Sequence, residues 1–409
     1  MKNKNVLLVI PPQGVNTLTL NRLPMSVLYL AGALRAQYRV GILDLSTLTD
    51  ANKVSFDAQL ELALSNALKE YTPFFIGISC LFAGQSNKVK TVAQLLKQKL
   101  PEVPVVLGGI HATIFGAEIL HDVPEVDFVL KGEAEESILA LLTAIINKEG
   151  YQNVDGLVYR DTSGHARENP KQHFIHDLTI IPQPAYDLID FNDYCIDTSD
   201  WNNPKKHIIG VPVPLLTSRS CPNRCCFCAM YHSMGSKFRA RPAWHVADEM
   251  ELLVNNWGTK YFEIFDDNFT LSKKRTLQIC NEIIRRKLDI QFQTTNGVFV
   301  NSLDAEVIEA LAAAGMARVS LAIESGSDYM RNKVIGKHLS KEKIYEVCNT
   351  LKKYPDIKVN AFFILGMPEE THQTMQETYT MMQELPLDSV TISTAIPFPG
   401  TAANNTLSA

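Results

Sequence analysis

The chain has 409 residues, of which 46% are apolar and 20% charged, a balance that excludes a mostly disordered protein and leaves room for two or three domains. Its formal net charge is −5, so the chain has no general basic field to hold nucleic acid. It contains no uninterrupted apolar run of about 18 residues, which argues against a membrane span. The apolar run at 6–10 is too short for a signal peptide. We therefore expect a cytoplasmic protein.

Residues 1–150 alternate short apolar runs with helical patterns, as in an α/β domain. The runs have the length and composition of strands buried on both faces, and they occur at 6–10, 40–43, 74–79, 105–107 and 128–130. Between them, apolar residues at helical spacing over 60–68 predict a packed helix. The alternation predicts a doubly wound parallel sheet. Residues 151–208 are rich in turn-forming residues, and we expect a linker there with one short strand at 156–159.

Regular alternation returns over residues 209–409. Candidate strands lie at 215–217, 261–265, 290–294, 319–323, 359–365 and 390–393, and candidate helices at 244–255, 273–286, 304–314, 341–354 and 372–384. A complete eight-fold barrel usually needs about 250 residues. We therefore expect a partial, six-stranded (β/α)6 barrel of the TIM type, in a chain that is truncated or minimal because it stops soon after the sixth strand.

Four of the eight cysteines fall together, directly after the first expected barrel strand. Cys221, Cys225 and Cys228 have the spacing Cys-x3-Cys-x2-Cys, and barrel enzymes build their sites at that end of the strands. Thiolates select iron–sulfur clusters or zinc, and three of them would leave one iron of a four-iron cluster open. A zinc site with His232 as fourth ligand is the alternative, and Cys226 could replace a neighbour as ligand. The other cysteines are scattered, and we expect them to be small buried residues: Cys80, Cys195, Cys280 and Cys348.

This spacing, with the aromatic Phe227 before the last cysteine, resembles the cluster motif of the radical S-adenosylmethionine superfamily. The resemblance continues after later strands and covers about residues 210–401. It implies a [4Fe-4S] cluster on Cys221, Cys225 and Cys228, with S-adenosylmethionine as cosubstrate. The residues that it implies around the methionine amine, the ribose and the adenosine, in addition to Phe227, are Asp266, Asp267, Asn268, Glu324, Ser325, Gly366 and Pro368.

Each of these motifs also has a purely structural explanation. The acidic segment 266–268 could cap the next helix, because Asp and Asn favour helix N-caps. Glu324 could form an ion pair with Arg318 or Arg331. Gly366 could be needed only for a turn. Their shared position after successive strands favours the functional reading.

The loops after the strands of the first domain are where open α/β sheets place ligands. No Gly-x-Gly-x-x-Gly follows the first strand, which disfavours a dinucleotide, whereas adjacent glycines would let the backbone approach a large planar ligand. These loops resemble the cobalamin-binding domain of the cobalamin-dependent radical S-adenosylmethionine subgroup. The resemblance implies cobalamin contacts at Met25, Ser79, Cys80, Gly108, Gly109, His111, Gly132 and Glu133.

One departure from other cobalamin proteins is that Asp-x-His-x-x-Gly, whose histidine coordinates cobalt, is absent. We therefore expect no axial histidine from this domain, and expect His111 to contact backbone or the corrin rim. A degenerate domain that binds no cobalamin is the alternative.

The resemblance implies a radical enzyme that generates a 5′-deoxyadenosyl radical at the cluster. With cobalamin present, it points to a methyltransferase acting on an unactivated carbon of a small molecule. An oxidative cyclase or ring-rearranging enzyme of the same scaffold is the alternative, and a non-catalytic metal or corrinoid carrier is a third hypothesis. An electron donor such as flavodoxin or ferredoxin is the implied partner. The sequence indicates neither the substrate nor the oligomeric state.

Overall fold

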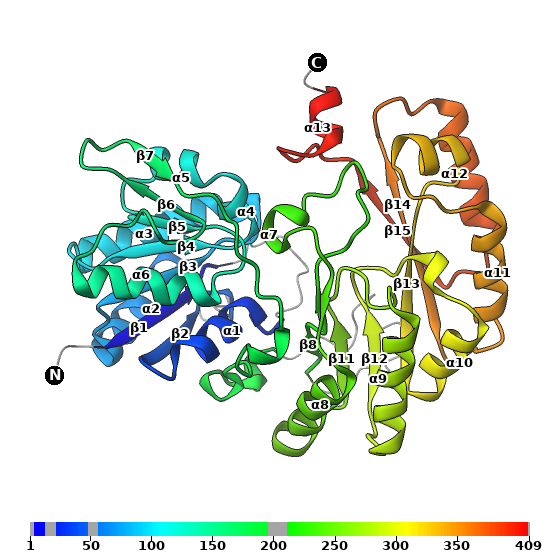
Figure 1. Ribbon diagram of the computed structural model, residues 1–409, viewed down its shortest axis with the longest axis horizontal. Helices are drawn as coiled ribbons and strands as arrows, with labels where there is room; N and C mark the ends of the chain where they lie inside the picture. Colours follow the sequence, from blue (N-terminus) through cyan, green and yellow to red (C-terminus); the bar gives the residue numbers. More distant parts are fainter. Residues whose placement is uncertain (1–3, 13–21, 48–55, 195–210, 408–409) are drawn as a thin grey trace. The chain divides into compact units, whose positions relative to one another are not determined.

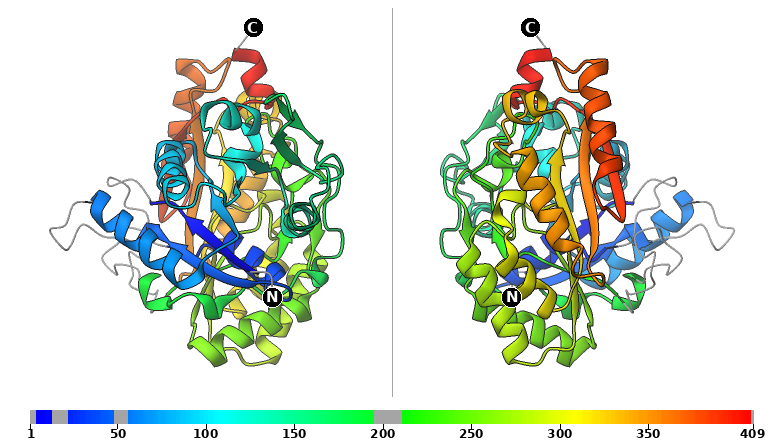
Figure 2. Two further views of the ribbon diagram at one scale, coloured as in Figure 1. Left: turned by 90° about the vertical axis from the view of Figure 1, so that its left-hand side faces the viewer. Right: turned by 90° about the vertical axis from the view of Figure 1, so that its right-hand side faces the viewer.

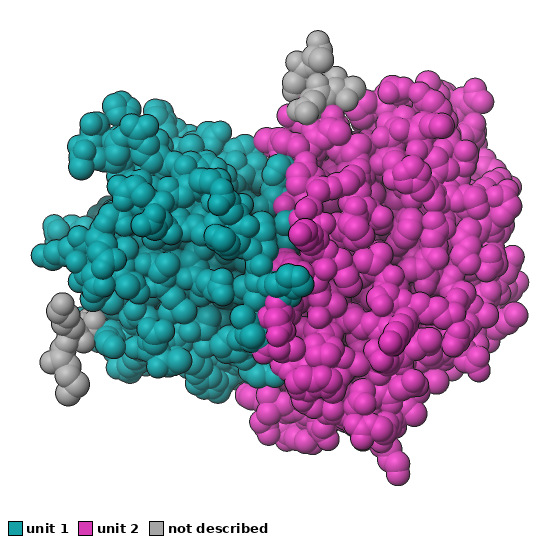
Figure 3. Space-filling view, in the orientation of Figure 1, with its two compact units in different colours: residues 1–176, 180–195, 232–235 teal, residues 177–179, 196–231, 236–409 magenta. Residues whose placement is uncertain are grey.

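The computed structural model describes residues 4–12, 22–47, 56–194 and 211–407 (Figures 1 and 2). Its contacts divide the chain into two compact units (Figure 3). The first unit comprises residues 1–176, 180–195 and 232–235, and the second comprises 177–179, 196–231 and 236–409. Within the described ranges, no helix is both long and apolar enough to cross a lipid bilayer.

The first unit is built on a seven-stranded sheet in the order β2-β1-β3-β4-β5-β6-β7. The strands are β1 (Asn5–Ile10), β2 (Arg39–Asp44), β3 (Phe75–Ser79), β4 (Val105–Gly108), β5 (Phe128–Leu130), β6 (Leu157–Arg160) and β7 (Ala166–Glu168). The first five run parallel, in the order 2-1-3-4-5 of a doubly wound fold. The predicted fold class is confirmed for this unit.

Helices cover both faces of this sheet: α1 (Met25–Leu34), α2 (Phe56–Tyr71), α3 (Ser86–Lys99), α4 (Ile110–Ile114), α5 (Gly116–Asp122) and α6 (Glu135–Asn147). Successive side chains of β1 enter opposite cores. Leu7 and Val9 pack with residues of α2, α3 and α5, whereas Val6 and Leu8 pack with residues of α1 and α6. A strand buried on both faces has to be apolar throughout, which is why these strands are recognisable in the sequence.

The structure differs from the expected linker over 151–208. Strands β6 and β7 pair antiparallel onto β5 and extend the first sheet. Leu157 and Val158 of β6 are buried in the two cores of this sheet, one on each face. Farther along, Lys171 forms an ion pair with Asp155 at 2.8 Å. The first unit therefore continues well beyond residue 150, and positions 195–208 of the expected linker lie outside the described residues.

The second unit contains a six-stranded, all-parallel sheet in the order β15-β14-β13-β12-β11-β8, as predicted. Its strands are β8 (Val213–Leu215), β11 (Tyr261–Ile264), β12 (Gln291–Thr294), β13 (Met316–Glu324), β14 (Lys358–Leu365) and β15 (Ser389–Thr394). Its main helices are α8 (Ala243–Trp257), α9 (Lys273–Arg285), α10 (Ala305–Ala313), α11 (Lys341–Leu351), α12 (His372–Glu384) and α13 (Ala402–Leu407). Helices α8 to α12 line the outer side of the curved sheet (Figure 2).

Parallel strands bring their carboxyl ends to one edge of the sheet, so the loops after β8, β11, β13 and β14 meet there. A short antiparallel pair, β9 (Ser218–Arg219) with β10 (Arg239–Ala240), joins the two ends of the long loop that follows β8. The four clustered cysteines lie within that loop.

Candidate active site

The cysteine loop begins at Ser220, which has a φ of 72° in the left-handed region. Within the loop, the Cys228 amide donates to the Cys225 carbonyl at 3.0 Å. The Cys225 thiol interacts electrostatically with those of Cys221 and Cys228 on the same loop. Burial raises the pKa of each thiol, and that of Cys225 to about 11. Binding of metal to these thiols would therefore have to displace protons.

The backbone of Cys226 anchors the loop through hydrogen bonds. Its amide donates to the Ile335 carbonyl at 3.1 Å, and its carbonyl accepts from the Ala403 amide at 3.0 Å. Its side chain and that of Phe227 pack against an apolar cluster that contains Met330 and Ile335. These contacts anchor the loop from outside, which accounts for both side chains without assigning either of them to a metal.

The described residues contain no group of three or more His, Cys, Asp or Glu side chains that could hold a single metal ion. The zinc set of three cysteines with His232 is therefore not assembled in this part of the chain. A four-iron cluster is a larger object whose ligands bind different irons. Three thiols gathered on one loop fit such a cluster.

Asp266, after β11, is fully engaged with the protein. One carboxylate oxygen accepts from the Thr217 amide at 2.6 Å, and the other accepts from the hydroxyls of Thr217 and Ser218. Asp266 thereby fastens the start of the cysteine loop to β11, and it is a positioning residue in this structure. The helix-cap explanation for 266–268 is wrong, because the side chain that caps α9 is Ser272.

Asp267 and Asn268 lie on the same turn. Asp267 accepts from the Ser220 amide at 3.1 Å, and burial together with the charge of Asp266 raises its pKa to about 7. Asn268 is 1% exposed, and neither its amide nitrogen nor its amide oxygen has a hydrogen-bond partner among the described residues. Burial raises the pKa of the Cys221 thiol, and the nearby Asn268 partly opposes that rise. An unpaired buried amide is costly, so Asn268 fits a site for a polar ligand beside the cysteines.

Glu324 ends β13 in the left-handed region, with a φ of 71°, at a register shift against β14. Its carboxylate accepts from the Lys337 ammonium at 2.7 Å, and both side chains are 7% exposed. The suggested ion pairs with Arg318 and Arg331 are therefore wrong. Lys337 was not predicted from the sequence. The one local signal is Gly336 before it, which has a φ of 78°.

Arg331 organises this region from a fully buried position within η8, a π-helical turn over Met330–Val334. It donates to the carbonyls of Ser325 at 2.9 Å and Leu339 at 2.6 Å. The Ser325 hydroxyl lies 3.0 Å from that of Thr378 and accepts from the Ser327 amide. The side chain of Ser325 thus forms hydrogen bonds within the protein. Together with the bonds of Arg331, they hold the loop that follows Glu324 in place.

The turn after β14 leaves a backbone surface open. Gly366 has a φ of 83° and is exposed, its amide donates to the Glu370 carboxylate, and the nearest atom to an added Cβ would be 3.8 Å away. Pro368 is half-buried in the same turn, and Met367 between them packs in the cluster that holds Phe227. The positive φ explains why the turn needs glycine at position 366. The exposed backbone also leaves the proposed adenosine contact possible.

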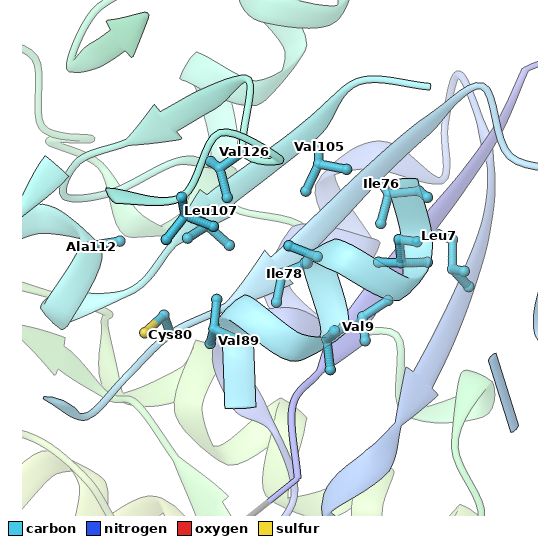
Figure 4. Packing of buried hydrophobic residues seen from close by; sticks show 14 of the residues in the cluster. Leu7, Val9, Ile76, Ile78, Cys80, Val89, Val105, Leu107, Ala112 and Val126 are labelled. Atoms are coloured by element: carbon cyan, nitrogen blue, oxygen red, sulfur yellow. The ribbon is translucent and has the colours of Figure 1, made fainter. Parts of the chain in front are cut away.

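In the first unit, the loops after β3 and β4 are bonded to each other. The Cys80 amide donates to the Gly108 carbonyl at 2.7 Å. The Cys80 side chain is 1% exposed, lies beside Val89 and Ala112 (Figure 4), and burial raises its pKa to about 12. Its thiol is therefore part of the core, and the prediction of a ligand contact can apply only to the backbone of this loop, which Ser79 begins.

The two adjacent glycines differ. Gly109 has a φ of 105°, and a Cβ there would lie 2.5 Å from the Cys80 carbonyl oxygen. Glycine is therefore required at 109 by loop packing, which corrects the expectation that it leaves room for a ligand. A Cβ at Gly108 would meet nothing closer than the Leu130 carbonyl, at 3.9 Å. Of the two glycines, only Gly108 has room for a Cβ without a clash.

The remaining predicted cobalamin residues lie on or near the same edge. His111, in α4, is half-buried with its ring 4.8 Å from that of Phe115, and burial lowers its pKa. The Gly132 amide donates to Thr113 Oγ1 at 2.9 Å, and the Glu133 carboxylate accepts from the Ile175 amide. Met25 starts α1 and is buried. Glu133 and Met25 thus have structural contacts that the sequence did not reveal.

Comparisons with known proteins agree with this architecture. The Radical SAM superfamily model matches residues 215–382, and the B12 binding domain model matches residues 15–142. An uncharacterised methyltransferase of Pyrococcus horikoshii is 29% identical over 98% of this chain and 82% of its own length. An anaerobic magnesium-protoporphyrin IX monomethyl ester cyclase of Rubrivivax gelatinosus is 26% identical over 92% of this chain and 64% of its own.

Among solved structures, the radical S-adenosylmethionine methyltransferase TsrM from Kitasatospora setae, with cobalamin and a [4Fe-4S] cluster bound, has a similar fold. The TM-score is 0.78 at 20% identity, over 98% of this chain and 74% of that one. Residues 215–382 thus carry a Radical SAM domain, and the cysteine loop lies within it. The chain also carries a B12 binding domain before it, so it combines the two domains.

Proposed function

We propose that this chain is a cobalamin-dependent radical S-adenosylmethionine methyltransferase that acts on an unactivated carbon of a small molecule. The single observation that carries the proposal is that Cys221, Cys225 and Cys228 share the loop after β8, where the buried side chain of Asn268 lies beside Cys221. When bound, the cofactors supply electron transfer into S-adenosylmethionine, the 5′-deoxyadenosyl radical that results, and a methyl carrier.

In the second unit, the chain's own residues would bind and orient the cosubstrate. Cys221, Cys225 and Cys228 would hold the [4Fe-4S] cluster and leave one iron open. Asn268 and Asp267 would meet the polar methionine end, because both lie buried next to the cysteine loop. Glu324 would accept from the ribose, and the exposed backbone at Gly366 would lie along the adenosine. Asp266 and Ser325 would hold these loops in place through the contacts described above.

In the first unit, the loops that start at Ser79, Gly108 and Gly132 would form a backbone cradle for cobalamin. The Cys80 amide donates to the Gly108 carbonyl, and the Gly132 amide donates to the Thr113 hydroxyl of α4, so these loops are held in place before a ligand binds. Gly108 has room for a Cβ at this edge. His111 would touch the corrin rim with a neutral imidazole and would not coordinate cobalt.

Partners and location follow from the same proposal. A low-potential one-electron donor such as flavodoxin or ferredoxin would reduce the cluster, and such a donor implies a cytoplasmic setting.

The test uses S-adenosylmethionine with a deuterated methyl group, added with a reductant and a metabolite extract to the reconstituted protein. We expect a product in which three hydrogen atoms of the added methyl group are replaced by deuterium. A product that lacks the label but has lost hydrogen would favour an oxidative cyclase, the alternative supported by the cyclase relative. Absence of any 5′-deoxyadenosine from protein that retains cluster and cobalamin would favour a corrinoid or metal carrier.

A further inference from the structure

The Lys337–Glu324 pair is a second polar feature beside the cysteine loop, and no role above uses the lysine. Both side chains are 7% exposed, and their charged atoms are 2.7 Å apart. Removing two charges from water costs several kcal/mol per ion, so a buried pair is weak evidence for stability. The backbone has a positive φ at Glu324 and at Gly336, the residue before Lys337. Such local adaptation is typical of functional sites.

The segment that carries Lys337 is attached to the cysteine loop. The Ile335 carbonyl accepts from the Cys226 amide at 3.1 Å, and the Ile335 side chain packs against the same loop. Farther along, the Lys337 amide donates to the Arg331 carbonyl at 2.9 Å. The backbone at Lys337 is therefore tied to the cysteine loop, and its ammonium is held by Glu324.

The cysteine loop packs directly against the segment that carries the lysine. Cys225 and Cys226 lie in the apolar cluster that contains Ile335, two residues before Lys337. Lys337 also interacts electrostatically with Cys225 and Cys221. The buried positive charge of Lys337 therefore belongs to the surroundings of the cysteine loop.

We propose that Lys337 raises the reduction potential of the cluster held by Cys221, Cys225 and Cys228, and that Glu324 limits the size of this effect. The inference rests on the proposed function, since it requires that cluster. Reduction adds one electron, taken from a low-potential donor, and increases the negative charge of the cluster. A fixed positive charge in a poorly solvated site favours the more negative form.

The experiment is a potentiometric titration of the reconstituted protein without S-adenosylmethionine, followed by the electron paramagnetic resonance signal of the reduced cluster. We expect Lys337→Met to lower the midpoint potential of the cluster by at least about 59 mV. For one electron this corresponds to a tenfold change in the reduction equilibrium constant. Lys337→Arg should keep the potential near that of the wild type. Glu324→Gln should raise it, because the ammonium then acts unopposed. Lys333→Met, an exposed lysine of the neighbouring turn, is the matched control and should change nothing.

An unchanged potential in Lys337→Met, with weaker binding of S-adenosylmethionine, would overturn the inference and make Lys337 a cosubstrate ligand. If Lys337→Met does not load a cluster, Glu324→Gln decides, and an unchanged or lower potential in that variant overturns it. A wild-type protein that holds no cluster would instead overturn the proposed function.

Discussion

Two adjacent glycines of the first unit allow a role in packing to be tested separately from a role in ligand binding. Gly108 and Gly109 are neighbours, but only Gly109 is held in the left-handed region and pressed against the Cys80 carbonyl. Replacing each with the same side chain should therefore have different consequences. Gly109→Leu should destabilise the first unit, whereas Gly108→Leu should fold normally and fill space at the carboxyl edge of the sheet.

We expect Gly108→Leu to retain much less cobalamin than the wild type after reconstitution and gel filtration. Its cluster absorbance should be unchanged, because the cysteines belong to the other unit. Bound cobalamin is measured by absorbance after release. Full retention of cobalamin by a folded Gly108→Leu protein would rule out the cradle described above.

His111 gives a second test in this unit. Its ring lies against Phe115 and burial lowers its pKa, so the imidazole is a neutral rim contact in our account. We expect His111→Ala to weaken cobalamin binding only mildly and to leave the electron paramagnetic resonance spectrum of bound cob(II)alamin unchanged. Loss of nitrogen hyperfine splitting in that variant would show that His111 coordinates cobalt.

Neighbouring cysteines of the loop have different proposed roles. Replacing Cys221, Cys225 or Cys228 with Ala should abolish cleavage of S-adenosylmethionine, because each would bind a different iron. Cys226→Ala should keep cleavage, since this residue holds the loop through its backbone and the substitution leaves those hydrogen bonds. Iron content and 5′-deoxyadenosine are the readouts. Retained iron in Cys225→Ala together with its loss in Cys226→Ala would reverse the assignment.

Elements of the second unit are connected by buried polar side chains. Arg331 is the clearest case, because it bonds the loop after β13 to the segment that carries Lys337. We expect Arg331→Met to lower the free energy of unfolding by about 3 kcal/mol, since several buried carbonyls would lose their donor. Urea denaturation measures this. Arg285→Met, in which an exposed arginine loses its pair with Glu282, should leave the free energy of unfolding nearly unchanged. Equal effects of the two substitutions would refute the role of Arg331.

The sequence predicted regular elements well where the pattern is local. Strands buried on both faces must be apolar, so β1 and β3 are visible as short runs, and the six barrel strands follow from their even spacing. The short strand expected at 156–159 is confirmed as β6. Strand β7 and the pairing of β6 with β5 were missed, because one short apolar run does not reveal which strand it pairs with.

The same contrast holds for the site. The three proposed cysteine ligands lie within eight positions, so their clustering and their resemblance to a known motif could be recognised in the sequence. The Glu324–Lys337 pair joins residues 13 apart, and it depends on a register shift and on the π-helical turn between them. Likewise, nothing in the sequence shows that Asp266 hydrogen-bonds to Thr217 and Ser218, while Asn268 lies buried beside Cys221.

At the scale of the whole molecule, two units with different sheets are joined in one chain, and the matches to the B12 binding and Radical SAM models fall on different units. The proposed activity needs both. The first would hold a methyl carrier, and the second would generate a radical. The relatives with which the chain shares this organisation include both a methyltransferase and a cyclase.

The claim common to every form of this account is that the second unit cleaves S-adenosylmethionine reductively. The most direct measurement is 5′-deoxyadenosine, quantified by mass spectrometry after dithionite is added to anaerobically reconstituted wild-type protein with S-adenosylmethionine. The account predicts that 5′-deoxyadenosine accumulates with time, and that it is absent from the Cys225→Ala protein. No 5′-deoxyadenosine from wild-type protein with a reduced, fully loaded cluster, or an equal amount from Cys225→Ala, would contradict it.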